Sequence, residues 1–238
     1  MPQFFVTSSS ISNGRCTIGG DDFHHLVGVR RVRTGDTIRL RDDKGASLSA
    51  RIESITADRL TAVIISESDA PHSPVDITLC MCLLKGGNFD LAVEKAVEVG
   101  VSRIIAVASE RTVPRPSDID SKLRRWNRKA EEAAKQSLRE RVPPVEGIRT
   151  FDEVLAGDRD RARIIAHPGS PLTLKEFLRS TEPGAVTLLV GPEGGFSPAE
   201  LDAAAAAGWV AAGFGFSQLR AETAAPVLCG IIMYEWGD

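Results

Sequence analysis

The 238-residue sequence has no apolar stretch that approaches the roughly 20 residues needed to span a bilayer. Residues 1–6 also lack the basic start and the long apolar core of a secretory signal peptide. Only four cysteines are present, and Cys80 and Cys82 are too close in sequence to form a sensible bridge on a strand. We therefore expect a cytoplasmic protein without a membrane partner.

Histidine and cysteine are also too scattered for a metal centre. His24 and His25 are adjacent, His72 and His167 are remote, and no Cys/His group has the spacing of zinc ligands. No metal cofactor is expected. The net charge of −3 and the pI of about 5.9 give no global argument for binding nucleic acid.

Two local clusters of basic residues contrast with this weakly acidic background. One lies between Lys122 and Arg141, and the other between Arg30 and Arg41. Such clusters pair with phosphates in nucleic-acid-binding proteins. A solvated helix face with glutamates as local partners explains the first cluster as well, and charge alone favours that interpretation.

Residues 1–70 are predicted to form a small β-barrel domain. Short β-branched runs with partial alternation are separated by glycine-containing turn signals; the runs are CTI, DTIRLRD, SLSARIESI and LTAVIISES. Residues 21–27 are the exception and fit a short helix with an Asp cap. Short strands at this spacing suggest a small barrel. Residues 68–74, with two prolines among polar residues, indicate a linker.

Residues 75–238 are predicted to form an α/β domain, because continuous apolar runs alternate with helical patterns. The expected strands are residues 77–84, 103–108, 162–166, 186–190 and 209–214. The expected helices are residues 89–99, 118–139, 174–179, 198–207 and 223–236, with Pro226 early in the last one. This alternation indicates a mostly parallel sheet with helices on both faces.

The loop between the fourth strand and the fourth helix, GPEGGF, is the most informative segment. Ser197, Pro198 and Glu200 form a capping box with proline at the first helical position, and Gly208 ends that helix. Glycines often serve only tight turns. Ligands of open α/β sheets bind outside the carboxyl ends of strands, however, so we expect this loop to bind a ligand.

Known glycine-rich loops do not fit this segment. A phosphate-binding P-loop requires Gly-Lys-Ser/Thr, whereas Gly194-Gly195 is followed by Phe196. A dinucleotide fingerprint requires G-x-G-x-x-G early in the fold, and the lone Gly213-Phe214-Gly215 has only 23 residues after it. A cofactor site would have to be built from the last strands and loops.

Three strand ends in the C-terminal half carry unusual loops: AHPG, GPEGGF and FGFSQLRAET. With them, the sequence resembles the RsmE-type 16S rRNA uridine-N3 methyltransferases of the SPOUT superfamily. The resemblance covers nearly the whole chain. VGPEGGFS followed by LRAETAA is its most specific part, and HHLVGVRRVRTGD, LLKGGNFDLAVEKAVEVGV and WNRKAEEAAKQSLRERVP lie in the expected order.

The resemblance implies a trefoil-knotted α/β domain that binds S-adenosylmethionine, preceded by a PUA-like β-barrel that helps to grip RNA. It also implies a homodimer that methylates 16S rRNA, in the context of the 30S subunit. Two alternatives stay open: a SPOUT methyltransferase acting on tRNA or 23S rRNA, and a non-catalytic RNA-binding dimer.

The resemblance also implies the residues of the cofactor site. Carried over by position, they are His167, Val190, Gly191, Glu193, Gly194, Gly195, Phe214, Gly215, Leu219 and Arg220. For Glu193, a loop carboxylate that satisfies nearby N–H groups is the preferred alternative, and His167 before Pro168 is alternatively a turn residue. The family usually has a Gly-Pro-Arg-like run before its Leu-Arg, whereas here Phe216-Ser217-Gln218 follows Gly215.

Methylation of uracil N3 requires a proton acceptor and a group that stabilises charge on the flanking carbonyl oxygens. Arg220 and Glu222 lie beside the implied methyl donor and supply these two types. Arg220 is expected to stabilise a uracil oxygen or a phosphate, and Glu222 to deprotonate N3 or orient Arg220. A first-turn acid favoured by the helix dipole is an equal alternative for Glu222. The expected RNA-binding residues are Arg30, Arg31, Arg33, Arg139 and Arg141.

Overall fold

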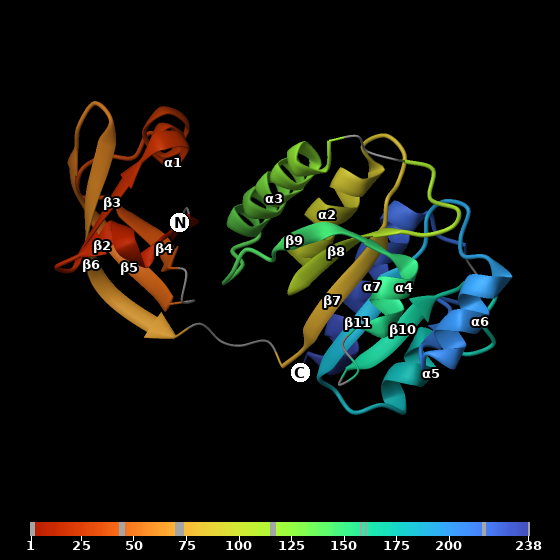
Figure 1. Cartoon of the computed structure of the whole chain (residues 1–238). Helices are drawn as coiled ribbons and strands as arrows, with labels where there is room; N and C mark the ends of the chain where they lie inside the picture. Colours follow the sequence, from red (N-terminus) through yellow and green to blue (C-terminus); the bar gives the residue numbers. More distant parts are fainter. Residues whose placement is uncertain are drawn as a thin grey trace. The chain divides into compact units, whose positions relative to one another are not determined.

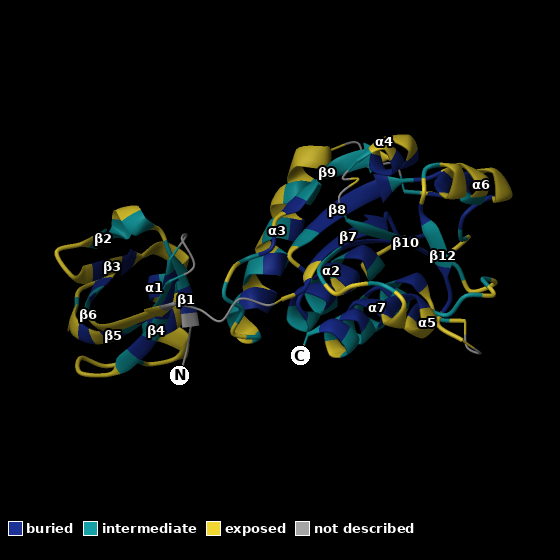
Figure 2. Ribbon diagram, turned by 90° about the horizontal axis from the view of Figure 1, so that it is seen from below, coloured by how far each residue is buried: buried dark blue, intermediate teal, exposed yellow. Residues whose placement is uncertain are grey.

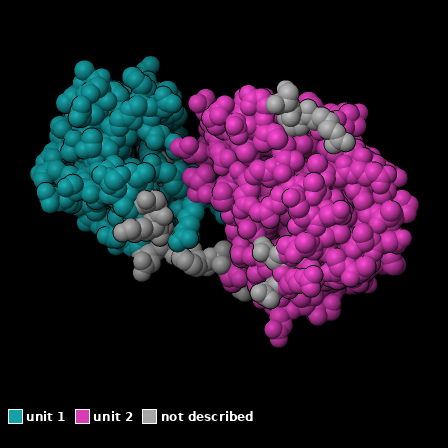
Figure 3. Space-filling view, in the orientation of Figure 1, with its two compact units in different colours: residues 1–72, 134–141 teal, residues 73–133, 142–238 magenta. Residues whose placement is uncertain are grey.

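The computed structural model describes residues 3–42, 46–69, 74–114, 118–157, 159, 161–215 and 218–237. These residues form two compact units (Figure 1). Unit 1 comprises Met1–His72 with Ala134–Arg141, and unit 2 comprises Ser73–Ala133 with Val142–Asp238 (Figure 3). Across the described part of the chain, no helix has the length and apolar character that a membrane crossing requires.

Unit 1 is built on a six-stranded sheet in the order β1-β4-β5-β6-β3-β2. The strands are β1 (Gln3–Val6), β2 (Ile11–Ser12), β3 (Arg15–Gly19), β4 (Thr37–Asp42), β5 (Ala46–Ile55) and β6 (Arg59–Asp69). All neighbours are antiparallel except β1 and β4, which are parallel. The described strands leave β1 and β2 as unpaired edges, so the expected barrel is a curled half-barrel.

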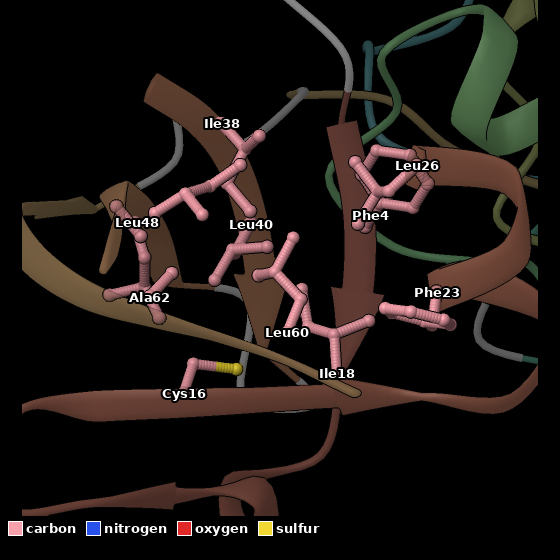
Figure 4. Packing of buried hydrophobic residues seen from close by; sticks show 12 residues of the cluster. Phe4, Cys16, Ile18, Phe23, Leu26, Ile38, Leu40, Leu48, Leu60 and Ala62 are labelled. Carbon is pink, nitrogen blue, oxygen red and sulfur yellow. The ribbon is translucent and has the colours of Figure 1, made fainter. Parts of the chain in front are cut away.

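Alternating side chains fill the inside of this curled sheet. Ile38 and Leu40 of β4 face Leu48 of β5, and Phe4 of β1 packs near Leu26 (Figure 4). The alternation follows from the two-residue period of a strand with one buried face. This hydrophobic cluster is the core of unit 1.

The helical turn of unit 1 differs from its prediction. Helix α1 (Gly20–His24) is followed directly by a π-helical turn, His25–Val29, and a 3-10 turn lies at Ser8–Ser10. The expected Asp cap is wrong. The N-cap is Gly19 without a side-chain bond, and Asp21 and Asp22 lie in the first turn, where the helix dipole favours acids.

Unit 2 is a six-stranded sheet in the order β12-β10-β11-β7-β8-β9, and each neighbouring pair is parallel. Its strands are β7 (Asp76–Cys82), β8 (Arg103–Ala108), β9 (Val145–Thr150), β10 (Ala162–Ala166), β11 (Ala185–Val190) and β12 (Val210–Ala212). Its helices are α2 (Asn88–Val99), α3 (Ile119–Gln136), α4 (Phe151–Ala156), α5 (Leu174–Arg179), α6 (Pro198–Ala206) and α7 (Ala221–Trp236). The predicted α/β class is confirmed.

Helices cover both faces of this sheet, as expected. Helices α2, α5 and α7 pack together on one face, and α4 and α6 lie on the other (Figure 2). Helix α3 packs against α2 through Trp126, whose ring lies 4.4 Å from that of Phe89. The strands β7, β8 and β11 are buried on both faces, so they are nearly continuous apolar runs in the sequence.

Four elements of unit 2, β9, α4, β12 and α7, differ from the sequence prediction. Strand β9 and helix α4 were not expected, and the last strand is three residues long rather than six. Helix α7 begins at Ala221, two residues before the predicted start, so Pro226 lies in its second turn rather than its first and removes one hydrogen bond of the helix. The expected linker lies partly outside the described residues.

Candidate active site

A cavity of about 490 Å³ opens at the carboxyl ends of β10, β11 and β12. Its volume falls within the usual range for small-molecule sites, about 300 to 1,000 Å³. Three loops surround it: the β10–α5 loop, the β11–α6 loop and the segment between β12 and α7. All lining residues belong to unit 2.

The β11–α6 loop, residues 191–197, ends in the predicted capping box, which is confirmed. The Ser197 N–H donates to Glu200 Oε2 (2.9 Å), and the Glu200 N–H donates to Ser197 Oγ (3.3 Å). Pro198 occupies the first helical position. Gly195 has a φ of +64° and Gly208, after the helix, has a φ of +81°, conformations that favour glycine.

Two other loops hold the β11–α6 loop in place. The Lys85 N–H, from the β7–α2 loop, donates to Glu193 Oε1 (2.9 Å). Arg111 Nη1, from the β8–α3 loop, donates to the Gly194 carbonyl oxygen (2.9 Å). Glu193 is thus a loop carboxylate that accepts a backbone N–H, while it also lines the cavity.

Glu200 connects the start of α6 to the β8–α3 loop. Besides its part in the capping box, its Oε1 accepts the N–H of Glu110 (2.8 Å). The residue is 8% exposed. A buried carboxylate is stable only with hydrogen-bond donors around it, and here two backbone N–H groups fill that role.

The β10–α5 loop is joined to the end of β12. The His167 N–H donates to the Ala212 carbonyl (3.0 Å). The Gly213 N–H donates to the Leu172 carbonyl (2.9 Å), and the Leu174 N–H donates to the Gly213 carbonyl (2.8 Å). A Cβ on Gly213 would lie 3.1 Å from the His167 carbonyl oxygen. Only glycine permits this close approach of two backbones without displacement.

The segment between β12 and α7 contributes Phe214, Leu219 and Arg220. Phe214 is 43% exposed, and Arg220 is the N-cap of α7. Glu222 lies in the first turn of α7, and its Oε2 is buried with no hydrogen-bond partner among the described residues. A buried carboxylate oxygen without a donor is costly, so it fits a polar group that enters the cavity.

The cavity brings together most of the predicted cofactor residues. Those that line it are His167, Val190, Gly191, Glu193, Gly195, Phe214, Leu219 and Arg220, and the predicted catalytic Glu222 lines it too. Gly194 and Gly215 are not among the lining residues: the Gly194 carbonyl accepts the bond from Arg111. Phe216 and Ser217 lie outside the described residues.

Sequence reasoning missed Asn88 and Gln218, which also line the cavity. Asn88 follows Gly86-Gly87 at the carboxyl end of β7, so the glycine pair after a buried strand was a usable signal. Arg111 was missed because nothing local marks it. Among the residues that the structure describes, no group of three or more His, Cys, Asp or Glu is arranged to hold a metal ion.

The predicted RNA-binding arginines all belong to unit 1. Arg30, Arg31 and Arg33 are exposed in the segment between the π-helical turn and β4, where Arg31 has a φ of +54°. Arg139 and Arg141 follow α3 in the segment Ala134–Arg141, which belongs to unit 1. Burial lowers the pKa of Arg139.

Known families match the chain over most of its length. Residues 71–233 match the family described as RNA methyltransferase domain, and residues 18–65 match the family described as RNA methyltransferase PUA domain. The ribosomal RNA small subunit methyltransferase E of Mycobacterium bovis is 31% identical, with 96% of this chain and 90% of the relative covered. That of Bacillus subtilis is 28% identical, with 92% and 90% covered.

A solved structure shares the fold. The ribosomal RNA small subunit methyltransferase E from Neisseria gonorrhoeae, crystallised bound to S-adenosyl methionine, has a TM-score of 0.90 and 32% identity. The match covers 100% of this chain and 99% of that chain.

Proposed function

This chain belongs to the RsmE family of ribosomal RNA small subunit methyltransferases, and on that premise we propose that it transfers a methyl group from S-adenosylmethionine to N3 of a specific uridine in 16S rRNA. The observation that carries the proposal is the cavity at the carboxyl ends of β10, β11 and β12. Eight of the ten residues that the resemblance assigns to the cofactor line it: His167, Val190, Gly191, Glu193, Gly195, Phe214, Leu219 and Arg220.

The lining residues fit S-adenosylmethionine. Val190, Leu219 and Leu228 offer apolar surface for the adenine and the thioether carbons, and Gly191 leaves backbone groups open. Glu222 Oε2, which has no hydrogen-bond partner among the described residues, suits a site that receives a sulfonium cation and a polar base. When bound, the cofactor supplies an electrophilic methyl group for in-line displacement, a reaction in which positioning provides much of the acceleration.

Arg220 and Glu222 are the proposed catalytic residues. Glu222 Oε2 is buried in the first turn of α7 and accepts the proton that must leave uracil N3 before nitrogen becomes nucleophilic. Arg220 is exposed at the N-cap of the same helix, and its guanidinium stabilises the negative charge on a flanking carbonyl oxygen. Both residues line the same cavity.

Single-turnover methylation at saturating cofactor and RNA tests these roles. Removing a general base costs about 10²- to 10⁴-fold in rate, and we expect Glu222→Gln to fall within that range. We expect Arg220→Ala to lose about 10²- to 10³-fold, as for other oxyanion-stabilising donors. An unchanged rate in either variant would exclude the role assigned to that residue.

Two further measurements separate the alternatives. Calorimetric titration with S-adenosylmethionine distinguishes the enzyme from a non-catalytic RNA-binding dimer, which would not bind the cofactor. Mass spectrometry of RNA from a deletion strain identifies the substrate: loss of one methyluridine from 16S rRNA supports the proposal, and loss from tRNA or 23S rRNA contradicts it.

We also propose that the chain folds as residues 1–70, a PUA-like RNA-binding domain, and residues 75–238, a SPOUT domain with a C-terminal trefoil knot. The bonds that join the β10–α5 loop to the end of β12 support the knot, since they bring the two segments side by side. The exposed arginines of unit 1 (Arg30, Arg31, Arg33 and Arg141) and the half-buried Arg139 support a role of that unit in gripping RNA.

A homodimer and a cytoplasmic 30S substrate complete the proposal. Tyr234 of α7 is 82% exposed and Leu91 of α2 is 44% exposed, on two helices that pack together. Aromatic residues are enriched at protein interfaces, so the exposed Tyr234 supports this proposal. Light scattering after gel filtration tests the dimer, and a comparison of free 16S rRNA with 30S particles tests the substrate.

A further inference from the structure

A tight turn follows β8, and its first and last residues, Ser109 and Thr112, are buried. Ser109 is 5% exposed and Thr112 is 3% exposed. The Ser109 N–H donates to Thr112 Oγ1 (2.9 Å), the two hydroxyl groups lie 2.9 Å apart, and the Thr112 N–H donates to the Ser109 carbonyl (3.1 Å). Three bonds between buried ends fix the two residues in the middle, Glu110 and Arg111.

Both middle residues reach the segment around the β11–α6 loop. The Glu110 N–H donates to Glu200 Oε1 (2.8 Å), at the start of α6. Arg111 Nη1 donates to the Gly194 carbonyl oxygen (2.9 Å). A Cβ built on Gly194 would lie 3.5 Å from Arg111 Cβ and 3.6 Å from Cδ, so the stem of the arginine lies along this glycine.

We propose that Arg111 is a positioning residue for the cofactor, which acts through the carbonyl of Gly194. This inference rests on the proposed function, because it names the ligand of the same cavity. Arg111 itself is not among the lining residues, whereas Glu193 and Gly195, on either side of Gly194, both are. By holding the Gly194 carbonyl, Arg111 fixes the backbone orientation of Glu193 and Gly195 toward the cavity.

Arginine suits this task better than a neutral donor. A hydrogen bond from a charged donor is roughly twice as strong as one between neutral groups. The backbone of Arg111 is already fixed by the bonds between Ser109 and Thr112. Through Arg111, this ordered turn holds Gly194, which has no side chain with which to form a hydrogen bond of its own. A preordered loop binds a ligand without first losing conformational freedom.

The expected effect of losing this bond is a weaker affinity for the cofactor at an unchanged rate of chemistry. We expect Arg111→Gln to raise the Kd for S-adenosylmethionine about 5- to 10-fold, which corresponds to about 1 to 1.4 kcal/mol. The KM for the cofactor rises in parallel. The kcat at saturating cofactor and RNA stays within twofold, because Arg111 touches neither reactant.

Calorimetric titration with S-adenosylmethionine alone measures the Kd, and steady-state methylation of 16S rRNA measures KM and kcat. Arg111→Lys keeps a charged donor and is expected to restore at least half of the lost affinity. Arg179→Gln is the matched control, because Arg179 is an exposed arginine of unit 2 with one 2.9 Å bond, to Glu235, and is not among the residues that line the cavity. This variant is expected to bind the cofactor with the Kd of the unchanged protein.

Three outcomes would overturn the inference: an unchanged Kd in Arg111→Gln, an equal loss in Arg179→Gln, or a raised KM for RNA with no change in cofactor affinity. The last result would make Arg111 an RNA contact instead. Failure of the unchanged protein to bind S-adenosylmethionine would contradict the proposed function, so the two failures are distinguishable. Thermal unfolding of each variant confirms that it folds before affinity is compared.

Discussion

Replacing Glu200 by alanine removes the acceptor of two backbone hydrogen bonds at the start of α6. Ser197 is 5% exposed, so its N–H stays buried and unpaired in the variant, at a cost of about 1 to 3 kcal/mol. Glu110 is exposed, so water replaces the carboxylate, and the cost there is about 0.5 to 1.5 kcal/mol. Together these losses predict that the free energy of unfolding falls by about 1.5 to 4.5 kcal/mol.

Urea unfolding followed by circular dichroism measures this change. The control is Glu176→Ala, which breaks the same kind of capping box at α5, with Thr173, but on an exposed side chain. Its midpoint is expected to shift much less than that of Glu200→Ala. A shift no larger in Glu200→Ala than in Glu176→Ala would refute the reasoning, because burial of the carboxylate would then make no difference.

Three further predictions concern the cavity, the pH dependence of stability and the thiols. Gly191→Ala is expected to weaken cofactor binding in calorimetry, because its Cβ would lie 3.0 Å from the buried ring of Phe196; an unchanged Kd would show that the ring yields freely. The hydrogen bond from Arg161 lowers the pKa of Asp76, so its stabilisation is present above the unfolded value of about 3.9 and is lost as pH falls through the folded value. As the pH is lowered below about 3.9, the Asp76→Asn variant should therefore lose less stability than the unchanged protein. Burial raises the pKa of Cys82 to about 12, and all four cysteines are buried, so a thiol reagent at pH 8 should label none before denaturation.

Local patterns in the sequence were sufficient for most elements of unit 2. The capping box of Ser197 and Glu200 depends on residues three apart, and the helix it predicts begins at the expected residue. Strands β8 and β10 have the predicted bounds; β8 is a nearly continuous apolar run buried on both faces, and β10 contains the buried pair Ile164-Ile165. Strand β9 was missed because VEGIRT carries glycine and two charged residues, as suits the edge of a sheet.

The contacts that shape the site were not predictable from the sequence. Glu200 meets Glu110 and Glu193 meets Lys85 across long stretches of chain, and no local periodicity encodes such pairs. The cavity residues themselves were found through family resemblance, because the residues of three separate loops share no common pattern. Asn88 was predictable from the sequence, since it follows a glycine pair after a buried strand.

The strand order of unit 2 has a consequence for the chain as it leaves the ribosome. Strand β7 is made first in this sheet and lies between β8 and β11, but β11 and the loops that enclose the cavity are made much later. Until then β7 exposes an unpaired edge, a state prone to wrong pairing. A nascent fragment that lacks α7 cannot form the complete cavity, since Ala221, Glu222 and Leu228 of that helix line it. Truncated products of this chain should therefore be removed by proteolysis rather than accumulate as partial cofactor-binding proteins.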